Sequence, residues 1–203
     1  MAQLLYLSSG AQETIEKIQC WSTPDAPITI GNIYSDLFKS LDAYDAILIG
    51  MHADQRRLAA HTGELAAYLE RGGTIVANGH VAYPYLPQIA PFQPIPDYRR
   101  DDLIVYRDSL HPVWDGVATE DLSQRRGVAG FYARGWHAPP PSAQVIHSIG
   151  DARRPVDFMY RVGSGRVLFH GGNELWAFDD GTSTAGRLAP QLFAWLSAGK
   201  RNS

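Results

Sequence analysis

The stretch DAILIGM (45–51) decides the fold predicted for this chain. After Asp45 it is a continuous apolar run, which is typical of a strand covered on both faces of a parallel sheet. The segment 54–71 then places Leu58, Thr62, Leu65 and Leu69 on one helical stripe, and Gly72 and Gly73 end that helix. A second apolar run, TIVANG (74–79), follows at once. This order predicts a strand, a helix and a parallel strand.

The same alternation extends back to the N-terminus. The segments LLYLSS (4–9) and APITIGN (26–32) are expected strands, AQETIEKIQCW (11–21) is an expected helix, and SDLFKSL (35–41) is a short one with Ser35 as its N-cap. Four strands alternating with helices indicate an open parallel sheet with helices on both faces. The loops that follow the strands then meet at one edge.

The pattern changes after residue 82. The segment 83–100 is rich in proline, with five between Tyr83 and Tyr98, and is expected to be an irregular surface excursion. Beyond it, further strands and a closing helix are predicted. The strands are DLIVYR (102–107), GFYARGW (130–136), AQVIHSI (143–149), VDFMYRV (156–162) and RVLFHGG (166–172), and the helix is 185–199.

Length and composition indicate a globular protein. The 203 residues are 45% hydrophobic and 19% charged, which is enough apolar sequence for a substantial core and most simply one domain over 1–203. The net charge of −3 comes from interspersed acidic and basic residues, so neither nucleic acid nor an anionic membrane is an expected partner.

Cysteine content and the N-terminal segment indicate the compartment. Cys20 is the only cysteine, which excludes an intramolecular disulfide and a cysteine-based zinc cluster, and we expect it to be a buried residue of the first helix. MAQLLYLSSG has no basic segment or long apolar run typical of a signal peptide. A cytoplasmic location is therefore expected.

Four phrases of the sequence resemble the class I glutamine amidotransferase-like superfamily, in particular its trehalose-utilisation (ThuA-like) branch. They are YDAILIGMHADQ (44–55), LAAYLERGGTIVANGH (65–80), HPVWDGV (111–117) and GSGRVLFHGGNELW (163–176). The resemblance implies a flavodoxin-like three-layer α/β/α sandwich, a mostly parallel central sheet and a cleft at the C-terminal ends of its strands, with extra β-rich structure in the second half.

The resemblance also implies catalytic positions, and the sequence departs from them. Amidotransferases of this superfamily carry a cysteine at a strand-to-helix elbow, where this chain has Asn78, Gly79, His80, Val81 and Ala82. None of these can attack an amide as a thiolate or alkoxide, which excludes glutaminase chemistry there. The family's late His and Glu correspond to His170 and, displaced by three residues, to Glu174.

The expected strand ends therefore bring a polar set to one rim. We predict His170, Glu174 and His80 as catalytic residues: His170 paired with Glu174 would be the general acid/base, and His80 would polarise or orient the substrate. The predicted ligand-binding residues are Ser9, Gly10, His52, Asn78, Gly79, Arg134, Asn173 and Trp176.

Structural explanations compete with several of these roles. His52 could bond the backbone, Asp54 could cap the following helix, and Asn78-Gly79 could form a tight turn. HPVWDGV (111–117) is typical of a proline turn.

The segment RRGVAGFYARGWH (125–137) could form a ligand-contacting wall or a half-exposed strand. The wall would present basic and aromatic side chains, namely Arg125, Arg126, Tyr132, Arg134, Trp136 and His137.

Three functions remain open at this level. The first is an enzyme or binding protein for a small polar metabolite, carbohydrate or nucleotide-like. The second is a non-catalytic assembly component, homo-oligomeric or bound to a protein partner through Tyr83, Tyr85 and Phe92. The third is a metal-dependent hydrolase using His52, Asp54, His80 and His170, although no compact metal motif is present and no cofactor is indicated.

Overall fold

The apolar runs of the first half form buried parallel strands. In the computed structural model, which describes residues 1–179 and 181–199, these are β1 (Leu4–Ser8), β3 (Ala46–Ile49) and β4 (Thr74–Asn78), and every residue in them is buried. The expected strand at 26–32 is β2 (Ile28–Asn32), which pairs with β1 at the sheet edge. Strand β12 (Gly165–His170) lies parallel to β4.

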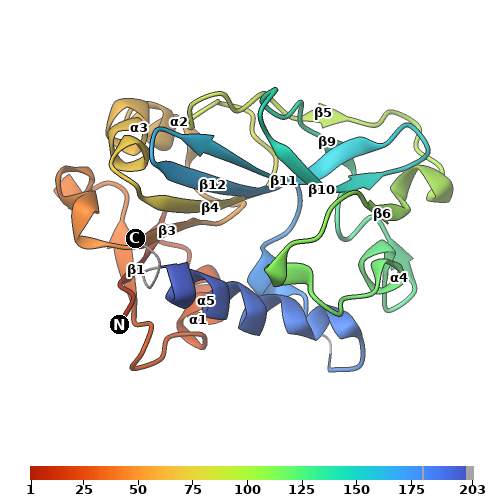
Figure 1. Cartoon of the computed structure of the whole chain (residues 1–203), viewed down its shortest axis with the longest axis horizontal. Helices are drawn as coiled ribbons and strands as arrows, with labels where there is room; N and C mark the ends of the chain where they lie inside the picture. Colours follow the sequence, from red (N-terminus) through yellow and green to blue (C-terminus); the bar gives the residue numbers. More distant parts are fainter. Residues whose placement is uncertain (180, 200–203) are drawn as a thin grey trace.

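The second half completes one eight-stranded sheet of order β2-β1-β3-β4-β12-β11-β10-β6 (Figure 1). Strands β11 (Arg154–Val162), β10 (Gln144–Ile149) and β6 (Val105–Arg107) continue it through antiparallel pairs. The mostly parallel α/β sheet expected from the sequence is confirmed.

Helices cover both faces of this sheet. Helices α1 (Gln12–Gln19) and α5 (Leu188–Ala198) share one hydrophobic core with Leu4, Leu48 and Val76. The 3-10 helix η1 (Asp36–Ala43) and helices α2 (Gln55–Ala59) and α3 (Thr62–Glu70) share the other core. Alternate residues of each buried strand thus pack against opposite layers, consistent with a flavodoxin-like sandwich.

The helix expected over 54–71 is broken in two. Asp54 caps α2 as one explanation predicted, since its Oδ1 accepts from the amides of Arg56 and Arg57. His61 then leaves the helical conformation and stacks on Phe38, with ring centroids 4.0 Å apart. This tertiary contact coincides with the break that the sequence pattern did not indicate. Likewise, the expected helix at 35–41 is 3-10.

The segment 83–100 is irregular, as predicted, but it is partly built into the core. Tyr85 is 1% exposed and Phe92 is half-buried, whereas Tyr83 is exposed. The expected contact surface of three exposed aromatic rings is therefore wrong for Tyr85. Within this segment, Gln93–Pro94 (β5) pairs with Gly135–Trp136 (β9). Of the expected strand 130–136, all of which the structure describes, only these two residues, Gly135 and Trp136, form a strand.

Short elements fill the remaining connections. They are η2 (Arg100–Leu103), η3 (Pro112–Trp114), α4 (Thr119–Ser123), β7 (Gln124–Arg125), β8 (Val128–Ala129), η4 (Leu175–Ala177) and η5 (Thr184–Arg187). In η3, His111 Nδ1 accepts from the Val113 amide at 3.3 Å, so the phrase 111–117 forms the expected proline turn.

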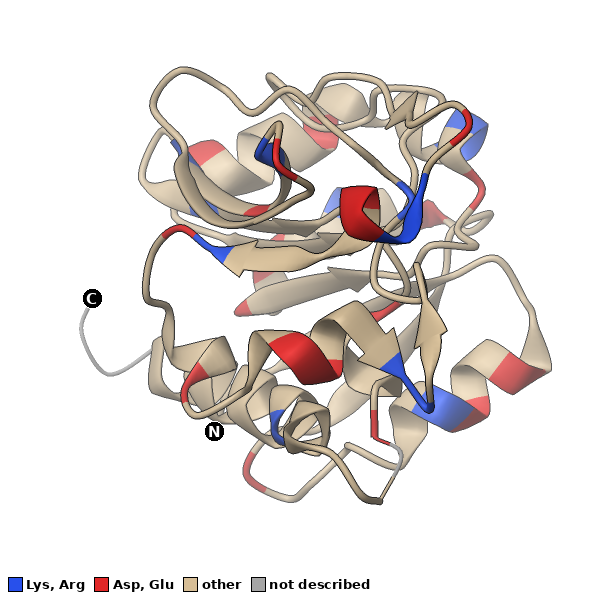
Figure 2. Ribbon diagram, turned by 90° about the vertical axis from the view of Figure 1, so that its right-hand side faces the viewer, with Lys and Arg blue, Asp and Glu red and all other residues tan. Residues whose placement is uncertain are grey.

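Basic and acidic positions are interspersed over the ribbon (Figure 2). Within residues 1–179 and 181–199, no helix is both long and apolar enough to cross a membrane.

Candidate functional site

The ends of the parallel strands form one continuous rim, as the sequence predicts. The Asp54 amide donates to Ser9 Oγ at 2.8 Å, which joins the loops after β3 and β1. Asn78 Nδ2 donates to the Ile49 carbonyl at 3.0 Å, and Asn78 Oδ1 accepts from the Leu175 amide at 3.1 Å. Loops from four strands are thereby held together by hydrogen bonds.

His170 and Glu174 share this rim but do not pair, so that part of the prediction is wrong. Glu174 Oε1 accepts from the Met51 amide at 3.1 Å, in the loop after β3. His170 Nδ1 lies 2.5 Å from Asp157 Oδ1, and both side chains are fully buried. The partner of His170 comes from the neighbouring strand and not from the loop that follows it.

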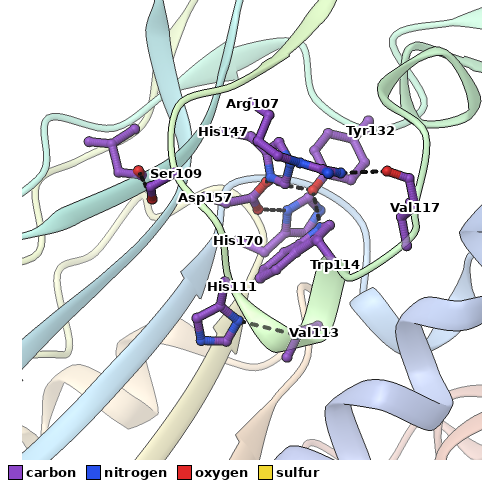
Figure 3. A network of polar contacts seen from close by, with 11 residues as sticks. Arg107, Ser109, His111, Val113, Trp114, Val117, Tyr132, His147, Asp157 and His170 are labelled. Atoms are coloured by element: carbon purple, nitrogen blue, oxygen red, sulfur yellow. Dashed lines mark hydrogen bonds and ion pairs between the residues drawn. The ribbon is translucent and has the colours of Figure 1, made fainter.

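Asp157 belongs to a row of polar residues that crosses four strands. Arg107, His147, Asp157 and His170 are successive register partners on β6, β10, β11 and β12. Arg107 Nε donates to His147 Nε2 at 3.4 Å, and His147 Nδ1 lies 2.9 Å from Asp157 Oδ2 (Figure 3). Since His147 Nε2 accepts, its Nδ1 carries the proton that Asp157 receives as a hydrogen bond.

Two aromatic side chains extend the hydrogen-bond network around Asp157. Tyr132 Oη donates to Asp157 Oδ2 at 2.5 Å, and Trp114 Nε1 donates to Tyr132 Oη at 2.9 Å (Figure 3). Burial alone would raise the pKa of the Asp157 carboxyl, but His170 and His147 outweigh it and lower that pKa to about 2. Asp157 is therefore a buried carboxylate with three hydrogen-bond donors.

The other ring nitrogen of His170 has no protein partner among the described residues. Its Nε2 is buried and lies 2.9 Å from the position that a Cβ on Gly172 would occupy. The ring also contacts Tyr132, with centroids 4.6 Å apart. Both Gly172 and Tyr132 line a cavity of about 290 Å³.

This cavity, which we call the inner pocket, contains several predicted residues. Its wall is formed by Met51, His80, Gly130, Phe131, Tyr132, Ala133, Arg134, Gly172 and Asn173. Three predicted site residues, His80, Arg134 and Asn173, thus come together beside His170. The Asn173 side chain is held by its Nδ2, which donates to the Phe131 carbonyl at 2.8 Å.

A second cavity of about 540 Å³, the outer pocket, shares Phe131 and Asn173 with the inner one. Its remaining lining residues are Lys17, Cys20, Trp21, His52, Arg125, Glu174, Trp176, Ala177 and Asp179. Here the structure places the predicted residues His52, Glu174 and Trp176. Cys20, expected to be buried, is exposed at the end of α1 and lines this pocket.

Four predicted ligand-binding residues have structural contacts and line neither pocket. Ser9 accepts from the Asp54 amide, Asn78 joins two loops, and the Gly10 amide donates to Ser8 Oγ. Gly79 has φ +102°, and a Cβ there would lie 2.5 Å from Met51 Cβ and 2.6 Å from Met51 Cα. The turn explanation for Asn78-Gly79 is supported, and position 79 has no room for a side chain.

His80 lies half-buried on the rim, beside the ring of Phe92 and the side chain of Gln55. It stacks on Phe92 with centroids 3.8 Å apart, and its carbonyl accepts from Gln55 Nε2 at 2.7 Å. Burial, followed by the charges of His170 and Arg134, lowers the pKa of His80. No helix follows β4; the chain enters the irregular segment, so the elbow implied by the resemblance is absent.

The segment 125–137 is divided between the core and the pocket wall. Tyr132 and His137 are buried, and His137 Nε2 accepts from the Val81 amide at 3.1 Å. Arg134 is exposed, and its Nε donates to the Gly130 carbonyl at 3.0 Å. Arg134 and Tyr132 both line the inner pocket, and Tyr132 in addition donates to Asp157.

The metal set considered from the sequence is not assembled. Asp54 caps α2, His170 binds Asp157, and no group of three or more His, Cys, Asp or Glu over 1–179 and 181–199 could hold a metal ion.

Sequence reasoning missed Asp157, His147 and Arg107. A signal was present, because Asp157 interrupts the apolar run VDFMYRV and His147 interrupts AQVIHSI. A charged or titratable residue inside a buried strand requires partners. Only strand order and register show that these residues are adjacent.

Comparisons with known proteins add to this geometry. Neither a scan against protein-family models nor a search of curated proteins finds a match. A cytoplasmic protein from Salmonella typhimurium is 11% identical, with 96% of this chain and 98% of that chain aligned and a TM-score of 0.60. A second cytoplasmic protein from Salmonella typhimurium LT2 is 11% identical, with 98% of both chains aligned and a TM-score of 0.58.

A third solved structure is that of a protein from Thermoplasma acidophilum proposed to be part of a GMP synthase. It is 12% identical, with 99% of this chain and 96% of that chain aligned and a TM-score of 0.61. At such identities the likeness shows the fold alone. Strand order, layers and these neighbours together identify an α/β fold consistent with a flavodoxin-like sandwich.

Proposed function

We propose that this chain is an amidotransferase-like protein of ThuA-like type, without glutaminase activity, that binds or processes a small polar metabolite at the inner pocket. The metabolite class is a carbohydrate or a nucleotide-like compound. The location is supported by the position of the pocket beyond the C-terminal ends of the strands, where open α/β sheets bind ligands.

The observation that carries the proposal is the orientation of His170. Asp157 holds its Nδ1, and the free Nε2 lies against Gly172 at the pocket wall. A histidine with a carboxylate on Nδ1 has a defined tautomer and can exchange a proton through Nε2. His170 would act as general acid or base, and Asp157 would position it.

The absence of glutaminase activity is supported by the backbone at the expected elbow. Gly79 is left-handed and in close contact with Met51, so a nucleophilic side chain at this position would collide with Met51. Without a covalent nucleophile, acid–base chemistry or ligand recognition is the remaining task for His80 and His170.

The test is a thermal-shift and turnover screen against a defined library of sugars, sugar phosphates and nucleotides. We expect the wild type to be stabilised by at least one compound, and His80→Ala to lose that stabilisation because the substitution removes part of the pocket wall. His170→Gln, which retains a polar group of similar reach, should bind the compound but not convert it if His170 transfers a proton.

The matched control is His61→Ala, which removes a histidine between α2 and α3, away from both pockets. It should bind the compound as the wild type does after correction for its own melting temperature. Unchanged binding and turnover in both His80→Ala and His170→Gln would show that the function lies elsewhere.

A further inference from the structure

We infer that the ligand of the inner pocket carries an anionic group, a carboxylate or a phosphate, held between Arg134 and His80. This inference rests on the proposed function and names the chemical class of its ligand. It depends on the charge distribution in the pocket, the anchoring of Arg134 and the free nitrogen of His170.

Arg134 is the one permanently charged side chain among the residues that line the inner pocket. Arg134 and His80 contribute their side chains to the wall, and neither Asp nor Glu is among the lining residues. Burial is the largest cause that lowers the pKa of His80, and electrostatic repulsion from His170 and Arg134 follows. An anion in the pocket would relieve that repulsion.

The side chain of Arg134 is held by a hydrogen bond that leaves its terminal nitrogens available for such a group. Its Nε donates to the Gly130 carbonyl at 3.0 Å, and Gly130 has φ +76°, a conformation suited to glycine. The side chain is exposed on the pocket wall while its Nε is anchored. An anchored guanidinium presents its terminal nitrogens in a planar fork that matches carboxylate and phosphate oxygens.

His170 gives the second, independent indication. Its Nε2 is fully buried and has no partner among the described residues, which is costly for a polar atom. Asp157 binds Nδ1, and Nε2 lies beside Gly172, which lines the inner pocket. A polar ligand group bound next to Gly172 would supply the hydrogen-bond partner that Nε2 lacks.

The outer pocket has a different character. It combines Lys17 and Arg125 with Glu174 and Asp179, and it adds the aromatic rings of Trp21 and Trp176. Phe131 and Asn173 line both pockets, so the outer pocket borders the inner one.

The test uses three matched probes, glucose 6-phosphate, glucuronate and glucose. Binding is followed by the amide NMR signals of Gly172 and Asn173 and by the melting temperature. We expect at least one of the two anions to shift both signals saturably, and glucose to bind at least about tenfold more weakly, because a charge-assisted hydrogen bond is lost. Comparison of the two anions distinguishes a phosphate site from a carboxylate site.

Arg134→Gln should weaken the anion about tenfold or more while the fold is retained, because Arg134 is exposed. Arg126→Gln is the control, since it removes the same charge from a nearby exposed position that does not line the inner pocket. Equal anion binding by wild type and Arg134→Gln would overturn the inference. If glucose shifts Gly172 and the anions do not, or if no probe shifts it, the inference fails. The proposed function is decided separately, by the screen of sugars, sugar phosphates and nucleotides.

Discussion

Asp157 is the residue on which the polar interior depends. Its two oxygens receive hydrogen bonds from His170, His147 and Tyr132, and its side chain is fully buried. An ionised carboxylate is tolerated inside a protein only when its partners replace water in this way. Removing its charge should therefore affect both stability and the orientation of His170.

Asp157→Asn should lower the free energy of unfolding at pH 7 by about 3 kcal/mol, because an amide cannot accept from all three donors. The pKa of Asp157 falls from 3.8 to about 2 on folding, so its contribution is present above pH 3.8 and is lost as the pH falls through 2. The difference in unfolding free energy between wild type and variant should therefore decrease as the pH falls from 3.8 to about 2. Urea unfolding at a series of pH values measures this difference.

The matched control for this experiment is Asp25→Asn, at an exposed position. The unfolding free energy of Asp25→Asn should equal that of the wild type at each pH. A gap between wild type and Asp157→Asn that stayed constant from pH 5 to pH 2 would mean that the carboxylate charge is not the source of stability.

Gly79→Ala should lower the free energy of unfolding by about 1–3 kcal/mol. The backbone is left-handed there, and the new methyl group would meet Met51 within 2.6 Å. Gly63→Ala is the comparison, since a methyl group on this helical glycine would have no atom within 4 Å and should gain helix propensity. Both effects can be read from chemical denaturation, and a neutral Gly79→Ala would contradict the close contact between position 79 and Met51.

At the scale of elements, α2 holds the start of the proline-rich segment. Gln55 Oε1 accepts from the amides of Ala82 and Tyr83 at 2.7 and 3.1 Å, and its Nε2 donates to the His80 carbonyl. One side chain at the helix start thus replaces the backbone hydrogen bonds that an irregular segment lacks.

Gln55→Ala should therefore increase amide hydrogen exchange at Ala82 and Tyr83 and loosen His80 without unfolding the sheet. Exchange followed by NMR or mass spectrometry checks this, with Gln19→Ala, exposed at the end of α1, as the control. Equal exchange at residues 82 and 83 in wild type and Gln55→Ala would show that other contacts hold the segment.

For the whole molecule, buried histidines predict sensitivity to acid. Burial lowers the pKa of His111 to about 4 and that of His137 to about 3, from 6.5. Between these values and 6.5 the unfolded chain binds more protons than the folded one, so stability should fall as the pH decreases from about 6.5 to 3.

His137→Gln separates one contribution from the rest. Its amide oxygen can accept from the Val81 amide as Nε2 does, but it does not titrate. The slope of unfolding free energy against pH should be shallower than in the wild type below pH 6. An identical slope would indicate that His137 is not among the groups that take up protons on unfolding.

The alternation of apolar runs and helical stripes was enough to predict the first half of the sheet. Strands β1, β3 and β4 follow from DAILIGM, TIVANG and LLYLSS because each run must be buried on both faces, and β2 adds a partly exposed edge strand. Positions at the ends of these strands, such as His52 and His80, also followed from it, since parallel strands end at one edge. Local sequence did not indicate the break at His61, which coincides with a ring stacked from η1.

The sequence by itself thus determined the α/β architecture, the parallel order of the first strands and the position of the polar rim. Only the tertiary structure decided that His170 pairs with Asp157 instead of Glu174, and that Arg134 and His80 face one pocket. The reason is that apolar periodicity is a local property of the chain. Cross-strand register between β11 and β12, and the path of irregular loops, depend on contacts between residues distant in sequence.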